Sequence, residues 1–519
     1  MKMRFSGSLT FLAILFFCAP GALLGREWTL KEVPQPVELK ILTQKGNAVL
    51  VEDELGAKFE LPVSNFSKAD QQFLRLLGQP AENKIAILAP GKPLPRGKDF
   101  QTSKAETLTN QFFTPKEATV LHLTGSDENL LAGSSFNFVH GDGWVVFEKF
   151  KPSVVRDQFL DRMLVNGAVA RLGKNIRIEP YGVGAVVIPH GPDFPALTLF
   201  ENEHLKGKEQ PFTTYQKTGS DFPASSFVLK RGYMATLAEN ADGTGASRNF
   251  VAQDHDLVIN KMPEELAGKL GSIRVFPWRW TTKKGICGDI VDNLDLGWYY
   301  NWNLNKNSTL DLEYVPIKQK RHWPGLNQDW KTRGSTHLLG FNEPDRPDQA
   351  NMSVDAAISA WPELMNSGLR LGSPSVSDGG LGWLYEFMDK ADKKGLRVDF
   401  VVIHYYRAVN KPGDGRAAAS QFYKFIENVH ERTKRPIWVK EWNNGANWTS
   451  APDPSPTEQK RAIAAMIEML EETPFVERYA LYNWVEPSRE LVRKDGSLTP
   501  AGEVYRDLES TISYQQERP

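Results

Sequence analysis

The segment LLGFNEPDRP, residues 338–347, leads an apolar run directly into an amide, a carboxylate and a proline. Proline has no N–H to donate to a sheet, so Pro344 predicts that a strand ends here. A second apolar run, IWVKEWNN at residues 437–444, leads in the same way into Glu441. Two carboxylates, Glu343 and Glu441, are therefore expected at the ends of two strands.

The sequence around these two runs alternates β-type and helical patterns. Helical periodicity is present in AAISAWPELMNSG (356–368), GWLYEFMDKADKKG (382–395), AAASQFYKFIENVHERT (417–433) and TEQKRAIAAMIEMLEET (457–473). The predicted strands are IRVFPW (273–278), GWYYNW (297–302), LEYVPI (312–317), HLLGFN (337–342), LRLGSPSV (369–376), VDFVVIHYY (398–406), RPIWVKEW (435–442) and RYALYNWV (478–485). Eight such units predict a (β/α)₈ TIM barrel over residues 276–519, with all-β accessory domains ahead of it.

In such a barrel the strand ends meet at one rim, so Glu343 and Glu441, three units apart, should face the same opening. Glycosidic bond cleavage needs this pair: one carboxylic acid protonates the leaving oxygen, and one carboxylate attacks or activates water. The neighbouring Asn342 is a suitable donor to a sugar hydroxyl. The structural alternatives are that Glu343 caps the next helix and that Glu441 pairs with Lys440 or Arg435. Two acids at corresponding strand ends favour catalysis.

Aromatic side chains accompany the carboxylates. Alternation along three runs places the following pairs each on one side of a strand: Tyr300 with Trp302, His404 with Tyr406, and Tyr482 with Trp484. Aromatic faces can stack on pyranose rings, although any one of them could instead fill the barrel. Five more tryptophans could extend such a cleft: Trp278, Trp323, Trp383, Trp442 and Trp448.

The motifs LLGFNEPD, VVIHYY and IWVKEWN, with GWYYNWN upstream and LYNWVE downstream, resemble glycoside hydrolase family 128, whose domain is the glycosyl hydrolase catalytic core. The resemblance covers about residues 276–510 and implies β-1,3-glucan cleavage with retaining chemistry. It implies Glu343 as acid/base and Glu441 as nucleophile, with Asn342, His404 and Tyr406 at the sugar and Trp484 lining the cleft. Two departures are HYY, where His-Trp-Tyr is common, and Lys440, where threonine is usual.

The chain ahead of residue 276 is predicted to hold a signal peptide and β modules. Residues 1–25 combine a basic start, an apolar run and small residues, which predicts a secreted, periplasmic or cell-surface protein without stable membrane insertion. Residues 26–87 resemble an SLA1 homology 1 module, residues 88–111 form a Pro/Gly/Lys-rich linker, and residues 112–190 are β-rich. With Cys18 removed, Cys287 is the one remaining cysteine, so no internal disulfide is expected.

Residues 191–275 contain an internal repeat. LFENEHLKG, from Leu199, and LAENADGTG, from Leu237, match at Leu, Glu, Asn and the final Gly, and each precedes a strand that contains serine. This arrangement resembles the paired Greek keys of βγ-crystallin-like domains. Some members of that family bind calcium, which would implicate Asp221 and Ser226, but the second copy has no matching acid before Ser272.

The composition limits the classes of partner and cofactor that the chain is expected to bind. The 62 Lys and Arg nearly balance the 63 Asp and Glu, so nucleic acid is not expected as a partner. Histidines and cysteines show no ligand spacing, and neither a metal nor another cofactor is required. Together with what the family resemblance implies, the prediction is a monomeric endo-β-1,3-glucanase acting on a polysaccharide. The alternatives are a hydrolase of another β-glycan (β-1,4-glucan, mannan, xylan or galactan) and a non-catalytic carbohydrate-binding or adhesive protein.

Overall fold

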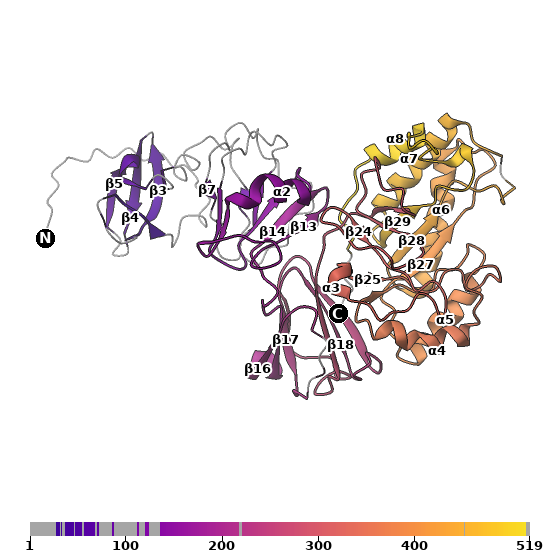
Figure 1. Cartoon of the computed structure of the whole chain (residues 1–519), viewed down its shortest axis with the longest axis horizontal. Coiled ribbons are helices and arrows are strands. Elements are labelled where there is room, and N and C mark those ends of the chain that lie inside the picture. The colour runs from indigo at the N-terminus through magenta and orange to yellow at the C-terminus, as the bar shows by residue number, and fades with distance from the viewer. Residues whose placement is uncertain are drawn as a thin grey trace.

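A computed structural model describes the C-terminal three quarters of the chain almost continuously (Figure 1). The described residues are 135–514 without 217, 218, 220 and 451, and before them 27–31, 33, 37–45, 47–53, 57–67, 70–71, 86–87, 112–113 and 120–123. The predicted signal peptide and the linker's residues 88–111 lie outside them. No helix within the described ranges combines the length and apolarity needed to cross a membrane.

The first described module is a small antiparallel sheet. It consists of β3 (Lys40–Lys45), β4 (Ala48–Glu52) and β5 (Lys58–Pro62), beside the short pair β1 (Glu27–Trp28) and β2 (Val37–Glu38). Alternation along β4 buries Val49 and Val51 against Trp28 and Phe66. This module lies at the end of the molecule far from the helices of the C-terminal domain (Figure 1).

The second module holds two sheets and one helix. The sheets run β13-β14-β10-β8-β6 and β12-β11-β9-β7, and helix α2 (Pro152–Phe159) packs on the first of them. The strands are β6 (Ala86–Ile87), β7 (Phe112–Phe113), β8 (Val120–Leu123), β9 (Ser135–Phe138), β10 (Trp144–Phe147), β11 (Met163–Val165), β12 (Ala168–Val169), β13 (Arg177–Tyr181) and β14 (Gly184–Ile188). The apolar runs of β10 and β14 are buried throughout, as expected for central strands.

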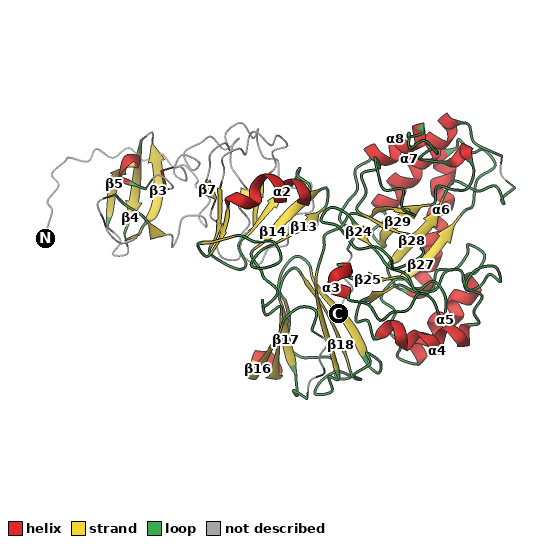
Figure 2. Cartoon of the chain, viewed as in Figure 1, coloured by secondary structure: helices red, strands yellow, loops and turns green. Residues whose placement is uncertain are grey.

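The third module is a pair of antiparallel sheets around one core (Figure 2). One sheet is β16-β15-β17-β20, formed by β15 (Leu197–Asn202), β16 (Lys206–Phe212), β17 (Ser226–Leu229) and β20 (Leu257–Ile259); the other is β19-β18-β21, formed by β18 (Tyr233–Ala238), β19 (Ser247–Ala252) and β21 (Ser272–Pro277). The repeat has a structural basis, because Gly207 and Gly245 have φ of 82° and 73°, and each lies against the Glu and Asn of its own copy.

The first predicted barrel strand, 273–278, is wrong. Those residues form β21, which pairs antiparallel with β18 in the accessory module, from Ser272 against Ala238 to Pro277 against Tyr233. The strand that opens the C-terminal sheet is instead β22 (Lys284–Cys287). The pattern of residues 273–278 is strand-like, but the sequence does not show which strand they pair with, because that choice depends on non-local contacts.

Eight parallel strands form the C-terminal domain, and their pairings close on themselves. They are β22, β23 (Trp298–Tyr300), β24 (Glu313–Tyr314), β25 (His337–Leu338), β26 (Arg370–Leu371), β27 (Val401–Tyr405), β28 (Ile437–Trp442) and β29 (Val476–Leu481). Six form one parallel sheet in the order β24-β23-β22-β29-β28-β27, and β25 pairs with β26. Parallel bridges Ile317–Leu339 and Gly372–Phe400 join the two sheets on both sides, which completes a ring in chain order.

The helices follow the later strands. They are α3 (Trp330–Arg333), α4 (Val354–Met365), α5 (Leu381–Lys393), α6 (Gly415–Thr433), α7 (Pro456–Glu472) and α8 (Pro500–Asp507). All four predicted helical stretches are confirmed, and α7 begins with a capping box between Ser455 and Glu458. Between β22 and β24 the described chain forms loops instead of helices, so the predicted (β/α)₈ alternation is incomplete there.

The amino end of the ring is filled by buried ion pairs and by the link to the third module. Arg478 pairs with Glu313 at 2.8 Å, and Arg370 pairs with Glu477 through two bonds of 2.7 Å. Trp278, just past β21, packs on His337 at the start of β25. Buried side chains therefore fill this end, and the opposite rim is where a site is expected.

Candidate active site

The two predicted carboxylates meet at the carboxyl ends of the strands, with His404 between them. Glu343 follows β25, and Glu441 lies near the end of β28. The buried His404 of β27 has Nδ1 2.8 Å from Glu343 Oε1 and Nε2 3.5 Å from Glu441 Oε1. Both acids thus face one imidazole ring, as the shared rim predicts.

Glu441 is almost fully buried and accepts three side-chain hydrogen bonds. Tyr300 donates its hydroxyl to Oε1 at 2.6 Å, and Trp302 donates its indole N–H to the same oxygen at 3.0 Å. Tyr406 donates to Oε2 at 2.9 Å. These donors come from the predicted aromatic pairs, and together they fix the orientation of the carboxylate.

The surroundings favour the ionised form of Glu441. Burial by itself raises the pKa of this carboxyl, but His404, Lys440 and the bonds from Tyr300 and Trp302 outweigh it and lower the pKa to about 2. A carboxylate that stays ionised and is held by three donors is suited to act as a nucleophile.

Glu343 has a different environment. Its φ is +40°, an uncommon value for a residue with a side chain, and its N–H donates to Ser375 O at 2.7 Å. Strained backbone of this kind concentrates at functional sites. The side chain is about one-eighth exposed, 13%, and Arg346 Nε lies 3.6 Å from Oε2. Glu343 therefore reaches the opening, which a proton donor to a leaving group requires.

Lys440 and Asn342 form a second contact between the two strand ends. The Lys440 ammonium is fully buried and donates to Asn342 Oδ1. It also lies 3.8 Å from Glu441 Oε1 and 4.9 Å from the centre of the Tyr300 ring. Glu441 therefore does have Lys440 as a nearby cation, as the structural alternative predicted, but this contact lies within the candidate active site.

Aromatic rings surround the carboxylates at the rim. Trp302 contacts Tyr482 and Trp484, with ring centres 5.9 and 6.1 Å apart, and Tyr406 contacts Trp448 at 5.1 Å. Trp484 and Trp448 are 44% and 59% exposed. Exposed tryptophans next to buried carboxylates provide apolar faces on which a sugar ring could stack.

Three of the tryptophans expected to extend the cleft lie elsewhere. Trp278 is buried at the amino end, Trp383 lies on α5 and stacks on Phe387, and Trp442 is buried outside the ring against Phe422 of α6. Trp323 is exposed, in the loop whose Gln319 accepts a bond from the Asn342 N–H.

Two residues of the site were not predicted as such. Lys440 stands out as a lysine inside the apolar run IWVKEW, which is a usable signal for a buried functional charge. Gly288 has φ +83°, and a Cβ there would lie 2.1 Å from the Trp484 ring. No sequence signal marked Gly288, because the strand before it, β22, was not predicted.

The chemistry of this arrangement is acid–base and nucleophilic. In the described part of the chain, His, Cys, Asp and Glu form no group of three that could hold a metal ion. Asp221 is exposed, and the buried Ser226 hydroxyl donates to Asn202 O while it accepts from the Leu205 N–H.

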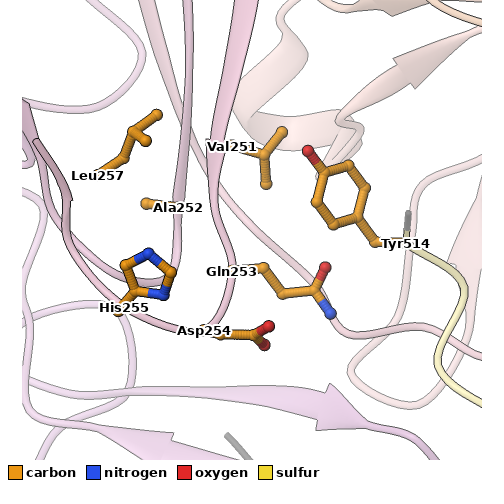
Figure 3. Close-up of a pocket in the computed structure, with 7 residues that line it drawn as sticks. All are labelled: Val251, Ala252, Gln253, Asp254, His255, Leu257 and Tyr514. Atoms are coloured by element: carbon orange, nitrogen blue, oxygen red, sulfur yellow. The ribbon is translucent and has the colours of Figure 1, made fainter. Parts of the chain in front are cut away.

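Figure 3 shows a separate pocket, whose lining includes neither carboxylate. It is lined by Val251, Ala252, Gln253, Asp254, His255, Leu257 and Tyr514. Tyr514 packs against Trp278, which places the pocket near the amino end of the ring. Active sites of this architecture form at the other end.

Comparisons with known proteins match the C-terminal domain. The family model of the glycosyl hydrolase catalytic core matches residues 278–505. Alkali-sensitive linkage protein 1 of Schizosaccharomyces pombe is 29% identical over 259 residues, which is 46% of this chain and 44% of that protein. The chain thus spans less than half the length of this curated relative.

Solved structures also match this domain. An endo-β-1,3-glucanase of GH128 subgroup I from Amycolatopsis mediterranei, in complex with laminaritriose, is 32% identical, covers 43% of this chain and 98% of its own, and has a TM-score of 0.39. A curdlan-specific exo-β-1,3-glucanase of GH128 subgroup III from Blastomyces gilchristii is 29% identical, covers 44% and 98%, and has a TM-score of 0.35.

The paired carboxylates and the matched sequence define an enzyme of the glycosyl hydrolase class. Through residues 278–505 the chain is similar to the glycosyl hydrolase catalytic core family. The SLA1 homology 1 and βγ-crystallin resemblances of the accessory modules stay predictions.

Proposed function

We propose that the chain is a secreted, retaining endo-β-1,3-glucanase. The observation that carries the proposal is the convergence of Glu343 and Glu441 on His404 at one rim, beside exposed tryptophans. Two solved GH128 structures, 32% and 29% identical to this chain, are named as β-1,3-glucanases, which supports β-1,3-glucan as the substrate. Residues 1–25 support secretion through their signal-peptide pattern.

In this mechanism Glu441 attacks the anomeric carbon and forms a covalent glycosyl-enzyme. Glu343 donates a proton to the departing glycosidic oxygen, then takes one from the water that releases the sugar. The low pKa of Glu441 supports its assignment as nucleophile, and the more open position of Glu343 supports its assignment as acid/base.

The other side chains supply binding. Asn342 and Tyr406 are placed beside the acids, so they are assigned to sugar hydroxyls near the cleavage point. Tyr482 and Trp484 offer ring faces to neighbouring sugar units. Tyr300 and Trp302 are assigned to holding the nucleophile, because both donate hydrogen bonds to Glu441 Oε1.

The test is reducing-sugar release from laminarin, curdlan, carboxymethylcellulose and glucomannan. The wild type should cut laminarin and curdlan and release oligosaccharides, while Glu343→Ala and Glu441→Ala should lose at least about a thousandfold of the activity. Cleavage of carboxymethylcellulose or glucomannan alone would move the substrate to another β-glycan. Binding without any cleavage would make the domain a carbohydrate-binding module.

Stereochemistry decides the mechanism. Retention at the anomeric carbon, followed by ¹H NMR in the first minutes of hydrolysis, is the expected result. Inversion would refute the covalent intermediate.

A further inference from the structure

Lys440 is a buried cation that directly precedes the assigned nucleophile, Glu441, in the sequence. Its side chain has no exposed surface, and burial lowers the pKa of the ammonium while the Glu441 charge opposes that change. A buried ammonium is costly unless its N–H groups find partners. The partners here are Asn342 Oδ1, the Tyr300 ring face and the Glu441 carboxylate.

Lys440 points inward because of an irregularity in β28. Opposite β27, the pairing passes from Ile403–Val439 to His404–Glu441, so Lys440 is an extra residue on its strand. A bulge of this kind re-aims side chains and is common beside active sites. Lys440 and Glu441 both reach the site as a result, although they are adjacent in sequence.

The ammonium also decides which way the Asn342 amide faces. An ammonium only donates, so the atom that it contacts must be the amide oxygen. The Asn342 NH₂ group is therefore directed away from Lys440, and it lies 3.4 Å from Gln349 Oε1. In this orientation the amide presents a donor to a sugar hydroxyl.

We propose that Lys440 is a positioning residue that holds the Asn342 amide in its donor orientation and keeps the Glu441 carboxylate charged. The inference rests on the catalytic roles assigned above to Glu441 and Asn342. Lys440 would act through these two neighbours and need not contact the substrate.

Several other groups face this pair and set the baseline for a pH test. They are Cys287 from β22, Tyr300 from β23, Glu343 from the loop after β25, His404 and Tyr406 from the β27 end, and Tyr482 after β29. His404 and Tyr300 lower the pKa of Glu441 independently of Lys440. Removing Lys440 should therefore shift the titration of Glu441 without abolishing its ionisation at neutral pH.

Two substitutions separate the two parts of the proposal. Lys440→Met removes the charge and the donor, whereas Lys440→Gln removes the charge but keeps a donor for Asn342. Both should move the acidic limb of the kcat/KM profile on laminarin up by about one pH unit or more. Lys440→Met should in addition lower kcat about tenfold, and this loss should largely disappear in an Asn342→Ala background.

Lys284→Met is the matched control. Lys284 is also a buried lysine on a strand of the ring, but its ammonium binds backbone oxygens of Tyr505, Arg506 and Leu508 at the end of α8. This variant should lower the melting temperature and leave the acidic limb in place. Limbs that coincide in wild type, Lys440→Met and Lys440→Gln would overturn the proposal, as would failure of both Lys440 variants to fold, since Lys440 would then be a folding determinant.

Failure of the proposed function would be a distinct result. If the wild type cuts none of the polysaccharides, the titration of Glu441 can still be followed by ¹³C NMR of carboxyl-labelled glutamate, assigned with Glu441→Gln. An unchanged Glu441 titration in Lys440→Met and Lys440→Gln would then refute the electrostatic role directly.

Discussion

Tyr300→Phe should slow the release of the covalent intermediate more than its formation. The substitution deletes the hydroxyl that donates to Glu441 Oε1 at 2.6 Å and leaves the ring in place. A hydrogen bond to a charged acceptor contributes about 1.5–3 kcal/mol. Glu441 leaves the sugar as a carboxylate in the second step, so losing this bond should slow that step by about 10- to 150-fold.

The same substitution changes the titration of Glu441. Since about 1.4 kcal/mol corresponds to one pKa unit, the pKa of Glu441 should rise from about 2 by about one to two units. At pH 6 the carboxylate is still ionised, so the loss of activity there reports on nucleophile energetics and not on protonation.

The linked effect on stability has a definite sign. Glu441 has a lower pKa folded than its usual 4.5, so its ionisation stabilises the fold above pH 4.5, and this contribution is lost as the pH falls toward 2. Tyr300→Phe should therefore lower the melting temperature at pH 7 more than at pH 3.

The assay is a pre-steady-state burst with an aryl β-laminaribioside. A burst of phenol that is larger relative to the steady rate in Tyr300→Phe than in wild type is the expected outcome. Tyr505→Phe is the control, because the buried Tyr505 hydroxyl donates to Gly285 O, away from both acids. Steady rates within twofold of wild type, with an unmoved acidic limb, would refute the reasoning.

Other changes should separate stability from catalysis. Glu313→Gln breaks the buried pair with Arg478 and should cost about 3–5 kcal/mol of unfolding free energy, measured by urea denaturation, with KM unchanged in the protein that remains folded. Gly288→Ala should displace the Trp484 ring, which a Cβ would approach to 2.1 Å, and should raise KM for laminarihexaose severalfold; an unchanged KM would place that ring outside the cleft. Trp448→Ala removes a 59% exposed ring and should raise KM while the melting temperature stays within about 2 °C, and a large fall in melting temperature would make Trp448 a packing residue instead.

The sequence was informative where local patterns agree with tertiary structure. The four helical stretches have apolar residues at helical spacing, and their buried faces pack on the sheet, so periodicity was sufficient. The ends of β25 and β28 were visible because a polar cluster follows an apolar run at each. These two features placed Glu343 and Glu441 at one rim.

The first strand of the ring, β22, was not predicted, because two of its residues have low strand propensity and are present for the contacts that they make. In β22, the Lys284 ammonium donates a hydrogen bond to the Leu508 carbonyl at the end of α8. Gly285 leaves room for the Trp298 ring, because a Cβ at this position would lie 2.5 Å from that ring. Lysine and glycine are depleted in strands, so KGIC does not look like one. The β-rich run 273–278 was predicted as the first strand of the ring instead. The later strands kept their correct numbers only because this one extra strand made up for the one missed strand.

The bulge in β28 makes the inward and outward order of its side chains depart from strict alternation. Along β28, Trp438 and Lys440 point inside the ring, so strict alternation would turn Glu441 outward and Trp442 inward. The extra residue at Lys440 reverses this order, and Glu441 meets Tyr300 inside while Trp442 packs outside on Phe422. Alternation could not show this, because a bulge depends on the register with β27 and β29 and leaves no mark on the hydrophobic pattern. The same bulge supplies the buried cation, so the carboxylate and the ammonium that controls it come from one local departure from regular strand geometry.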